Sequence, residues 1–455
     1  MNLPNYFLVD LPREATLSPV MLAEACQTLK RNRERYLAGR STERIVNVLS
    51  DVAEAWLRPD NTFRKLALEL GPAETGFSIP TLKRGLDDFF RQITRDNLHA
   101  LLVQELGDTR RPDVMTATEV EQKSSRAAVA MGPEFLVHIA AGNIPNPAFM
   151  GIVLGLLVRS AQFVKCANGS AFLPRLFAHS LYEADSKLGA CLELAQWRGG
   201  NTDLENVLFA EADCITATGS DETLASIRSR LPARTRFLGY GHRVSFGFVA
   251  KEVLSHSGGP RIASRVTDDV VAWNQLGCLS PHVIYVQPGG EVSPERFAEL
   301  LADELERREQ TEPRGELPAP HAATIATRRG IYEVRAAHSP ETLMWHSKES
   351  TAWTVIFEAD ARFQTSCLNR FVYVKPVKDL TELLQNAEVV RGKVSTVGVA
   401  APEHQAEELA LPLARWGVTR VCPLGQMQNP PLTWRHDGRP ALGDLVTWTD
   451  LEKGF

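Results

Sequence analysis

The chain has few cysteines, and their arrangement excludes two common ways of stabilising a fold. Only seven of its 455 residues are cysteines, and no two of them form a Cys-x-x-Cys pair. They are Cys26, Cys166, Cys191, Cys214, Cys278, Cys367 and Cys422. A widely spaced set of odd number fits neither a disulfide framework nor a zinc knuckle, and it is typical of a reducing compartment. We therefore expect free thiols, no metal site and a cytoplasmic location.

Long apolar runs and blocks of like charge are also missing. The chain carries 50 Lys and Arg against 55 Asp and Glu, a formal net charge of −5, and it lacks the basic clusters of nucleic-acid-binding proteins. Its longest apolar stretch, residues 147–158, falls short of the roughly 20 residues of a transmembrane helix. Residues 1–13 lack the basic segment and apolar run of a signal peptide. The sequence thus predicts no membrane span, no targeting segment and no nucleic-acid partner.

Sequence signatures of several common enzyme classes are absent as well. The chain contains no Gly-x-x-x-x-Gly-Lys-Ser/Thr loop, no His-Glu-x-x-His and no Gly-x-Ser-x-Gly. These absences argue against a P-loop nucleotidase, a metalloprotease and an α/β-hydrolase. The Gly-x-Gly-x-x-Gly fingerprint is missing too, so any dinucleotide must be bound in another way.

The order of the predicted elements indicates the fold class. Residues 1–110 predict a helical N-terminal layer for packing and subunit contact, with helices over residues 19–36, 42–57 and 79–106. Strands and helices alternate over residues 111–245 and again over residues 246–425, and residues 426–455 form a C-terminal tail whose first part is rich in Pro and Gly. We predict an α/β fold of two lobes, each with a mainly parallel sheet flanked by helices.

Three strand ends of the first lobe carry residues suited to a nucleotide, because parallel sheets bind ligands at the carboxyl ends of their strands. Asn143 either presents its amide to an oxyanion or caps the following helix. Lys165 either contacts ribose hydroxyls or a 2′-phosphate, or reaches solvent. Thr218, Gly219 and Ser220 open a helix whose N-terminus either holds a pyrophosphate or is plainly capped. Each signal is weak alone, and together they favour a cofactor site.

Cys278 is the candidate nucleophile among the seven thiols. It follows Gly277 in a loop between a helix and an apolar strand, whereas the other six cysteines stand in ordinary helix or strand patterns. A free cysteine in such a pattern behaves as a small buried hydrophobe. The same structural role remains open for Cys278, because a loop position alone is weak evidence of reactivity.

The residues around Cys278 resemble a known family. The segment Asn274-Gln275-Leu276-Gly277-Cys278 looks like the catalytic-cysteine segment of the aldehyde dehydrogenase superfamily. Asn143, Lys165 and Thr218-Gly219-Ser220 stand in the order of its oxyanion asparagine, ribose-binding lysine and pyrophosphate turn. From about residue 133 onward, the chain is more closely similar to the acyl-CoA reductase family typified by the fatty acid reductase of bacterial luminescence (LuxC type). The segments 420–425 and 436–440 are especially like that family.

One segment departs from ordinary aldehyde dehydrogenases. Those enzymes carry a glutamate in Glu-Leu-Gly-Gly that activates water, whereas the corresponding segment 238–243 has no acidic residue. An enzyme that handles thioesters should not hydrolyse its own acyl intermediate, so the missing base fits acyl-CoA chemistry. His242 in this segment is a candidate acid/base, and a structural histidine is an equally good interpretation.

The resemblance implies a cofactor lobe over residues 111–245, a catalytic lobe over residues 246–425 and a reductase reaction. Cys278 would take the acyl group of a fatty acyl-CoA or another acyl thioester, and NADPH, with NADH possible, would supply the hydride. The implied assembly is a homo-oligomer, with an acyl-protein synthetase or acyltransferase as a possible partner. Two alternatives stay open: a cysteine-dependent acyltransferase or thioesterase, and a non-catalytic subunit of a fatty acid reductase complex.

Overall fold

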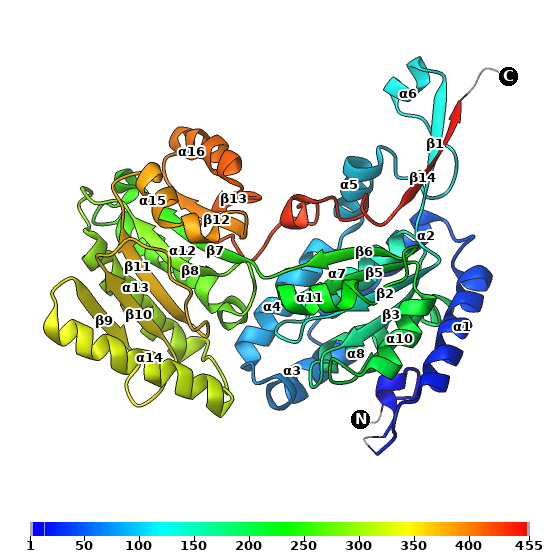
Figure 1. The fold of residues 1–455 in the computed structure, drawn as a ribbon, viewed down its shortest axis with the longest axis horizontal. Helices are drawn as coiled ribbons and strands as arrows, with labels where there is room; N and C mark the ends of the chain where they lie inside the picture. The colour runs from blue at the N-terminus through cyan, green and yellow to red at the C-terminus, as the bar shows by residue number, and fades with distance from the viewer. Residues whose placement is uncertain (1–2, 13, 453–455) are drawn as a thin grey trace.

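The computed structural model describes residues 3–12 and 14–452, which form two lobes that lie side by side (Figure 1). The first lobe holds the N-terminal helices, a five-stranded sheet and the last described residues, and the second lobe holds a seven-stranded sheet. Both sheets are mainly parallel and both are flanked by helices. The predicted α/β class, the two lobes and the helical N-terminal layer are therefore confirmed.

Six α-helices precede the first strand within the described residues, and the first five make up the N-terminal layer. They are α1 (Pro19–Tyr36), α2 (Thr42–Leu57), α3 (Thr62–Thr75), α4 (Ile79–Gln92), α5 (Arg95–Leu106) and α6 (Glu119–Lys123). The first two helices have the predicted bounds. The predicted helix over 79–106 is wrong in extent, because Ile93 leaves the helical conformation and the Thr94 hydroxyl caps α5 by accepting the Asn97 backbone N–H at 3.2 Å.

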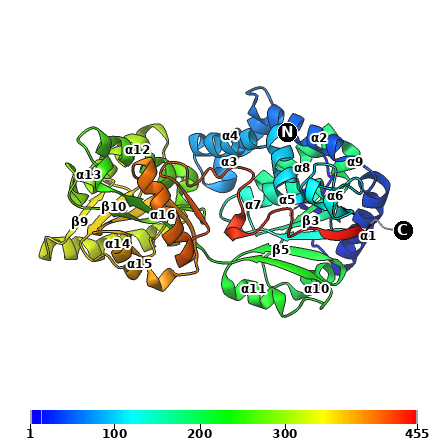
Figure 2. The ribbon, with the colours of Figure 1, turned by 90° about the horizontal axis from the view of Figure 1, so that it is seen from above.

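The sheet of the first lobe is fully parallel in the order β4-β3-β2-β5-β6. Its strands are β2 (Phe135–Ile139), β3 (Ala161–Cys166), β4 (Leu192–Gln196), β5 (Cys214–Thr218) and β6 (Arg236–Tyr240). Its helices are α7 (Asn146–Leu157), α8 (Phe172–Ala184), α9 (Ser186–Gly189), α10 (Thr202–Glu211) and α11 (Asp221–Arg228). One face packs on α7, α8 and helices α2 to α5, and the other packs on α1, α10 and α11 (Figure 2).

Helix α7 packs closely against the sheet because its glycines leave room for polar strand residues. A Cβ atom at Gly155 would lie 2.3 Å from the side chain of Gln162. The Gln162 Oε1 accepts a 2.9 Å hydrogen bond from Nε2 of His138, and Nδ1 of His138 accepts one of 2.7 Å from the Thr216 hydroxyl. The short apolar run of α7 is therefore a buried helix, as its length predicts.

The sheet of the second lobe has the order β13-β12-β7-β8-β11-β10-β9 and is parallel except for β9. Its strands are β7 (Val244–Val249), β8 (Pro281–Val286), β9 (Thr342–His346), β10 (Thr354–Glu358), β11 (Phe371–Pro376), β12 (Val394–Ala400) and β13 (Arg420–Pro423). Its helices are α12 (Gly258–Val271), α13 (Pro294–Thr311), α14 (Ala319–His338), α15 (Leu380–Asn386) and α16 (Glu403–Trp416). The chain crosses between the lobes over residues 241–243, between β6 and β7.

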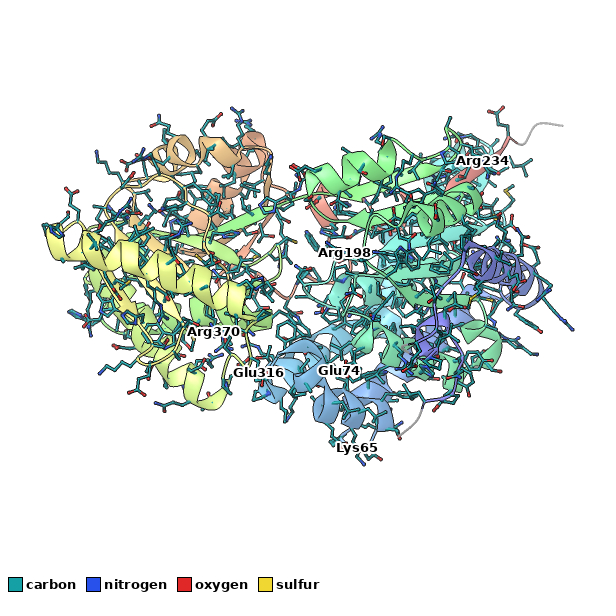
Figure 3. The ribbon with its side chains drawn as sticks, turned by 60° about the horizontal axis from the view of Figure 1, so that its bottom comes forward. Lys65, Glu74, Arg198, Arg234, Glu316 and Arg370 are labelled. Carbon is teal, nitrogen blue, oxygen red and sulfur yellow. The ribbon has the colours of Figure 1, made fainter. Side chains whose placement is uncertain are left out.

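After β13 the chain returns to the first lobe, where β14 (Thr447–Glu452) pairs antiparallel with β1 (Arg126–Met131) in a projecting ribbon (Figure 1). The lobes also meet at an isolated bridge between Phe77 and Gly315. Glu74 and Glu316 mark the two sides of this contact in Figure 3. The returning tail places residues from the end of the chain beside Cys278.

Membrane-spanning helices and metal-binding clusters are absent from the described residues. Among the helices within residues 3–12 and 14–452, none is long and apolar enough to cross a membrane. The same residues contain no group of three or more His, Cys, Asp or Glu side chains arranged to hold a metal ion.

Candidate active site

Cys278 lies in a loop between α12 and β8, and its side chain lines a cavity between the lobes. The Ser245 hydroxyl on β7 donates a 2.8 Å hydrogen bond to the Cys278 carbonyl and holds the loop to the sheet. Burial raises the pKa of the Cys278 thiol to about 12, and the negative charge of Asp437 adds to this effect. The thiol is protonated at neutral pH in this structure, so thiolate formation requires a group that accepts its proton.

The seven cysteines differ in their exposure. Cys26, Cys166, Cys191 and Cys214 are buried, and Cys278, Cys367 and Cys422 are partly exposed. Among the described residues, Cys278 is the one cysteine that lines this cavity, whereas the buried Cys166 lines a second cavity between the lobes. This placement favours Cys278 over the other six thiols as a nucleophile.

The backbone before Cys278 is strained. Residues 273–275, none of which is glycine, have left-handed φ angles of 48°, 52° and 65°. A second left-handed triplet, residues 368–370, with φ angles of 59°, 56° and 66°, packs against it. The Gln275 side chain joins the two segments, because its Oε1 accepts the Phe371 N–H and its Nε2 donates to the Phe371 carbonyl, both at 2.9 Å. Left-handed residues cost roughly 1–2 kcal/mol each, so these hydrogen bonds maintain the shape of the loop.

The cavity beside Cys278 is largely apolar. It lies between α4, α7, the Cys278 loop and the C-terminal tail, with a volume of about 230 Å³. Its apolar lining includes Phe89, Ile144, Met150, Leu154, Leu432 and Leu445. The one carboxylate among its described lining residues, Asp88, lies 3.9 Å from Nε of Arg84. The cavity therefore suits an apolar chain and offers Cys278 no unpaired carboxylate.

Asn143 follows β2, and its side chain reaches the Cys278 loop. Its Nδ2 donates a 2.6 Å hydrogen bond to the carbonyl of Leu276, two residues before the cysteine. Asn143 does not cap the next helix, because α7 begins with Pro145 as its N-cap residue. The exposed Asn143 lines a second cavity rather than the one with Cys278. Because an amide nitrogen has two hydrogens, one remains for a ligand.

Lys165 is the penultimate residue of β3, and it is only 6% exposed, so the alternative in which it reaches solvent is wrong. Its Nζ lies 5.7 Å from the ring centroid of Trp197, which follows β4. Trp197 Nε1 is buried and has no hydrogen-bond partner among the described residues. Burial lowers the pKa of Lys165, and the charge of Glu205 partly offsets this effect. The ammonium and indole groups are donors suited to hydroxyl or phosphate oxygens.

Thr218, Gly219 and Ser220 connect β5 to α11. The Ser220 hydroxyl caps the helix by accepting the Thr223 backbone N–H at 3.2 Å. The carboxylate of Asp221 stands in the first turn, where it weakens the attraction of this N-terminus for another anion. Thr218 lines the Cys278 cavity. The pyrophosphate role of this turn stays a prediction.

The structure separates His242 from the cavity. His242 is exposed, its backbone N–H donates to Asp221 at 3.1 Å, and it is not among the residues that line the Cys278 cavity. His436, in a turn of the tail (His436–Gly438), does line it. The His436 ring stacks on Tyr240 with centroids 4.6 Å apart and planes 13° apart. The acid/base role of His242 stays a prediction that the cavity does not support.

Sequence reasoning missed His436 as a site residue, although it begins the family-like segment 436–440. Its neighbour Asp437 is fixed by Nε of Arg243, at 3.1 Å, and by the Ser395 hydroxyl, at 3.3 Å. The sequence signal that could have indicated His436 is Trp434-Arg435-His436, a cluster of aromatic and basic residues in a tail that has no regular apolar period.

Solved structures of other proteins share this fold. A bifunctional proline utilization A (PutA) protein superposes with a TM-score of 0.73 over 96% of this chain and 45% of that chain, at 17% identity. A putative aldehyde dehydrogenase PutA from Anabaena variabilis gives 0.71 over 96% and 93%, at 16% identity. The Delta-pyrroline-5-carboxylate dehydrogenase from Mycobacterium tuberculosis gives 0.69 over 96% and 83%, at 13% identity. The fold is that of the aldehyde dehydrogenases, as the sequence predicts.

The family within this class is also shown. The family model described as Acyl-CoA reductase (LuxC) matches residues 37–448, and the chain belongs to this family. The long-chain acyl-protein thioester reductase of Aliivibrio fischeri is 23% identical over 329 residues, 70% of this chain and 64% of that protein. The protein of the same description from Vibrio harveyi is 21% identical over 426 residues, 92% of this chain and 84% of that protein. The chain thus spans less than two thirds of the first relative.

Proposed function

We propose that the protein reduces a long-chain fatty acyl thioester to the aldehyde, with Cys278 as the nucleophile and NADPH as the hydride donor. The observation that carries this proposal is the position of Cys278, a partly exposed thiol at an apolar cavity. Side chains such as Phe89, Met150 and Leu154 suit an acyl chain, because each buried methylene contributes about 0.8 kcal/mol.

The first half of the reaction is acyl transfer to Cys278. The thiolate attacks the thioester carbonyl, the bond from that carbon to the leaving sulfur breaks, and the acyl group stays on Sγ. Asn143 Nδ2 and the Cys278 backbone N–H would donate to the carbonyl oxygen as it becomes negative, an effect of roughly 3 kcal/mol per donor. The hydrogen bond from Asn143 to Leu276 ties the amide to the loop that carries the cysteine, although Asn143 lines a second cavity rather than the one with Cys278.

The residues at the strand ends of the first lobe fit a nicotinamide cofactor. Trp197 Nε1 is a buried donor without a partner in the described part of the chain, and Lys165 Nζ lies against the same ring. Both would donate to oxygens of the ribose. The ammonium of Lys165 favours the 2′-phosphate of NADPH, with NADH as the alternative donor. When bound, the cofactor would supply a hydride to the acyl carbon, and cleavage of the bond between that carbon and Sγ of Cys278 would release the aldehyde.

The surroundings of Cys278 favour reduction over hydrolysis. In ordinary aldehyde dehydrogenases, the base that activates water for hydrolysis of the acyl-cysteine is a carboxylate. Asp88 is the one carboxylate lining the cavity among the described residues, and it is paired with Arg84. Segment 238–243 at the crossover also lacks an acid. An acyltransferase or thioesterase is therefore the weaker candidate.

The acyl donor is a fatty acyl-CoA or an acyl-protein thioester. The family description favours the first, and the names of the curated relatives favour the second. An acyl-protein donor would make an acyl-protein synthetase or acyltransferase the natural partner. The exposed side chains of Met131, Trp448 and Leu451 on the β1–β14 ribbon support a homo-oligomer.

Product stoichiometry tests the proposed reaction. The purified protein is incubated with tetradecanoyl-CoA and NADPH, and CoA, aldehyde, fatty acid and oxidised cofactor are measured. A reductase gives CoA, aldehyde and NADP⁺ in equal amounts. CoA with free fatty acid and no cofactor oxidation would instead identify a thioesterase, and no consumption of either reactant would indicate a non-catalytic subunit.

Filling the cavity should change the preferred chain length. Leu154→Trp adds bulk to the cavity wall provided by α7. We expect turnover of a tetradecanoyl thioester to fall at least about tenfold, because each methylene that loses its burial costs about 0.8 kcal/mol. Turnover of a butanoyl thioester should be largely unaffected. Val103→Trp, at a 51% exposed position on α5, is the matched control. Equal losses with both substrates would contradict the assignment of the cavity to the acyl chain.

Removing the buried ammonium of Lys165 should weaken the binding of NADPH, measured in the absence of the acyl substrate. We expect Lys165→Met to raise the dissociation constant of NADPH by about 10- to 100-fold, because hydrogen bonds to charged groups contribute about 1.5–3 kcal/mol. Titration calorimetry measures this constant directly, and Lys348→Met, at an exposed position of the second lobe, is the control. An unchanged constant in Lys165→Met would contradict the ribose and phosphate role of Lys165.

A further inference from the structure

The His436 ring packs against two aromatic rings, and its nitrogens form no hydrogen bond within the described residues. One face stacks on Tyr240, with centroids 4.6 Å apart, and Trp434 lies against the ring with centroids 4.9 Å apart. Neither ring nitrogen makes a hydrogen bond with any group in the described residues, and the residue lines the cavity that contains Cys278. Stacking fixes the ring while leaving its nitrogens available for proton exchange.

Other histidines near the site are occupied by structural hydrogen bonds. Both nitrogens of His138 are bonded, to Thr216 and Gln162. Nδ1 of His282 is bonded to Ser366, with a distance of 3.0 Å to the hydroxyl, and burial lowers the pKa of His282 to about 4. Among the histidines that line the Cys278 cavity in the described structure, His436 is the one whose ring nitrogens are both unbonded.

The geometry points to His436 as the acid/base of acyl transfer, an inference that rests on the proposed function. His436 takes the proton from Sγ of Cys278 as the Sγ–carbon bond forms. The bond between the carbonyl carbon and the leaving sulfur then breaks, and the same proton passes from His436 to that sulfur. After hydride transfer, the carbon–Sγ bond breaks, and Cys278 regains a proton from solvent through His436. The proton taken from solvent balances the overall reduction.

The charges around His436 fit a neutral base. Burial lowers its pKa from the ordinary value, Asp437 opposes this shift, and Arg439 and Arg243 add to it. The guanidinium of Arg439 lies 4.5 Å from the ring centroid of Tyr240, on which His436 also stacks. Burial therefore favours the neutral form of the imidazole and the protonated form of the Cys278 thiol, which are the forms that proton transfer from Cys278 to His436 requires.

The rate of acylation as a function of pH tests this inference. Transfer of label from radioactive tetradecanoyl-CoA to the protein is followed by rapid quench without NADPH, from pH 5.5 to 9.5. We expect wild-type acylation to rise on the acid side and level off near neutral pH. His436→Gln should be about 100-fold slower at pH 7, rise about tenfold per pH unit toward pH 9.5, and regain part of its rate with added imidazole. His256→Gln, with an 85% exposed side chain, should match the wild type.

Several outcomes would overturn the inference. One is His436→Gln acylating at the wild-type rate, and another is a slow rate that keeps the wild-type pH profile and is not rescued by imidazole, which indicates a structural role. A comparable loss in His242→Gln alone would move the role to that residue.

If His436→Gln does not fold, the pH profile of the wild-type protein decides, because a rise of tenfold per pH unit through neutrality means that no base acts. A wild-type protein that takes no label refutes the proposed function itself. If the wild-type protein is labelled, a normal rate in His436→Gln refutes only the role of His436.

Discussion

Cys278→Ala should take no acyl label from tetradecanoyl-CoA and form no aldehyde. The substitution removes the atom that accepts the acyl group, and loss of an enzymatic nucleophile lowers turnover by about four to six orders of magnitude. The fold should persist, because the loop is held through backbone and neighbouring groups, including the Ser245 hydroxyl on the Cys278 carbonyl. Quench-flow labelling and aldehyde assay measure the two losses.

The other partly exposed cysteines provide the control for this result. Cys422→Ala and Cys367→Ala change thiols that do not line the Cys278 cavity. Both variants should label at the wild-type rate. Label retained in Cys278→Ala and lost in either of the others would place the nucleophile elsewhere.

Arg370→Met should destabilise the second lobe and slow acylation. Arg370 is fully buried in the second lobe (Figure 3), where its Nε donates to the Asn274 side chain at 3.1 Å and its Nη1 to Glu309 and to the Glu312 carbonyl, both at 2.8 Å. Removing one partner of a buried ion pair costs about 3–5 kcal/mol. Because Asn274 is in the strained triplet before Cys278, we also expect acylation to fall at least about tenfold.

Calorimetry and the acylation assay separate the two effects of Arg370→Met. The unfolding midpoint should drop by roughly 10 °C for a lobe of this size. Arg391→Met removes an exposed pair with Glu388, so it should change stability by less than about 0.5 kcal/mol and leave acylation unaltered. A stable Arg370→Met with a normal acylation rate would show that this clamp does not hold the Cys278 loop.

Elements with a regular apolar period could be predicted from sequence, and those without one could not. Helices α1 and α2 were predicted to the residue because their buried positions recur at helical spacing. Helix α14 was missed because its buried positions include Arg329, which bonds the Ser347 and Thr354 hydroxyls and hides the apolar period. Strand β14 is exposed at every position, so no alternation marks it.

The candidate site was predictable in part for a similar reason. Cys278, Asn143 and Lys165 follow predicted strands or lie between predicted elements, so local order along the chain points to them. The place of His436 depends on the tail returning from β13 to stack on Tyr240, a contact between residues almost 200 positions apart that no local pattern encodes. His242 stood out because it follows β6 in sequence, and the fold leaves it exposed.

A chase of the isolated acyl-protein tests the central claim most directly. The protein is labelled with radioactive tetradecanoyl-CoA, freed of excess substrate and then divided between buffer alone and buffer with NADPH. The proposed function predicts that label stays on Cys278 in buffer and leaves as aldehyde, in an amount equal to the cofactor oxidised, when NADPH is added. Label lost as free fatty acid at the same rate with and without NADPH would contradict it.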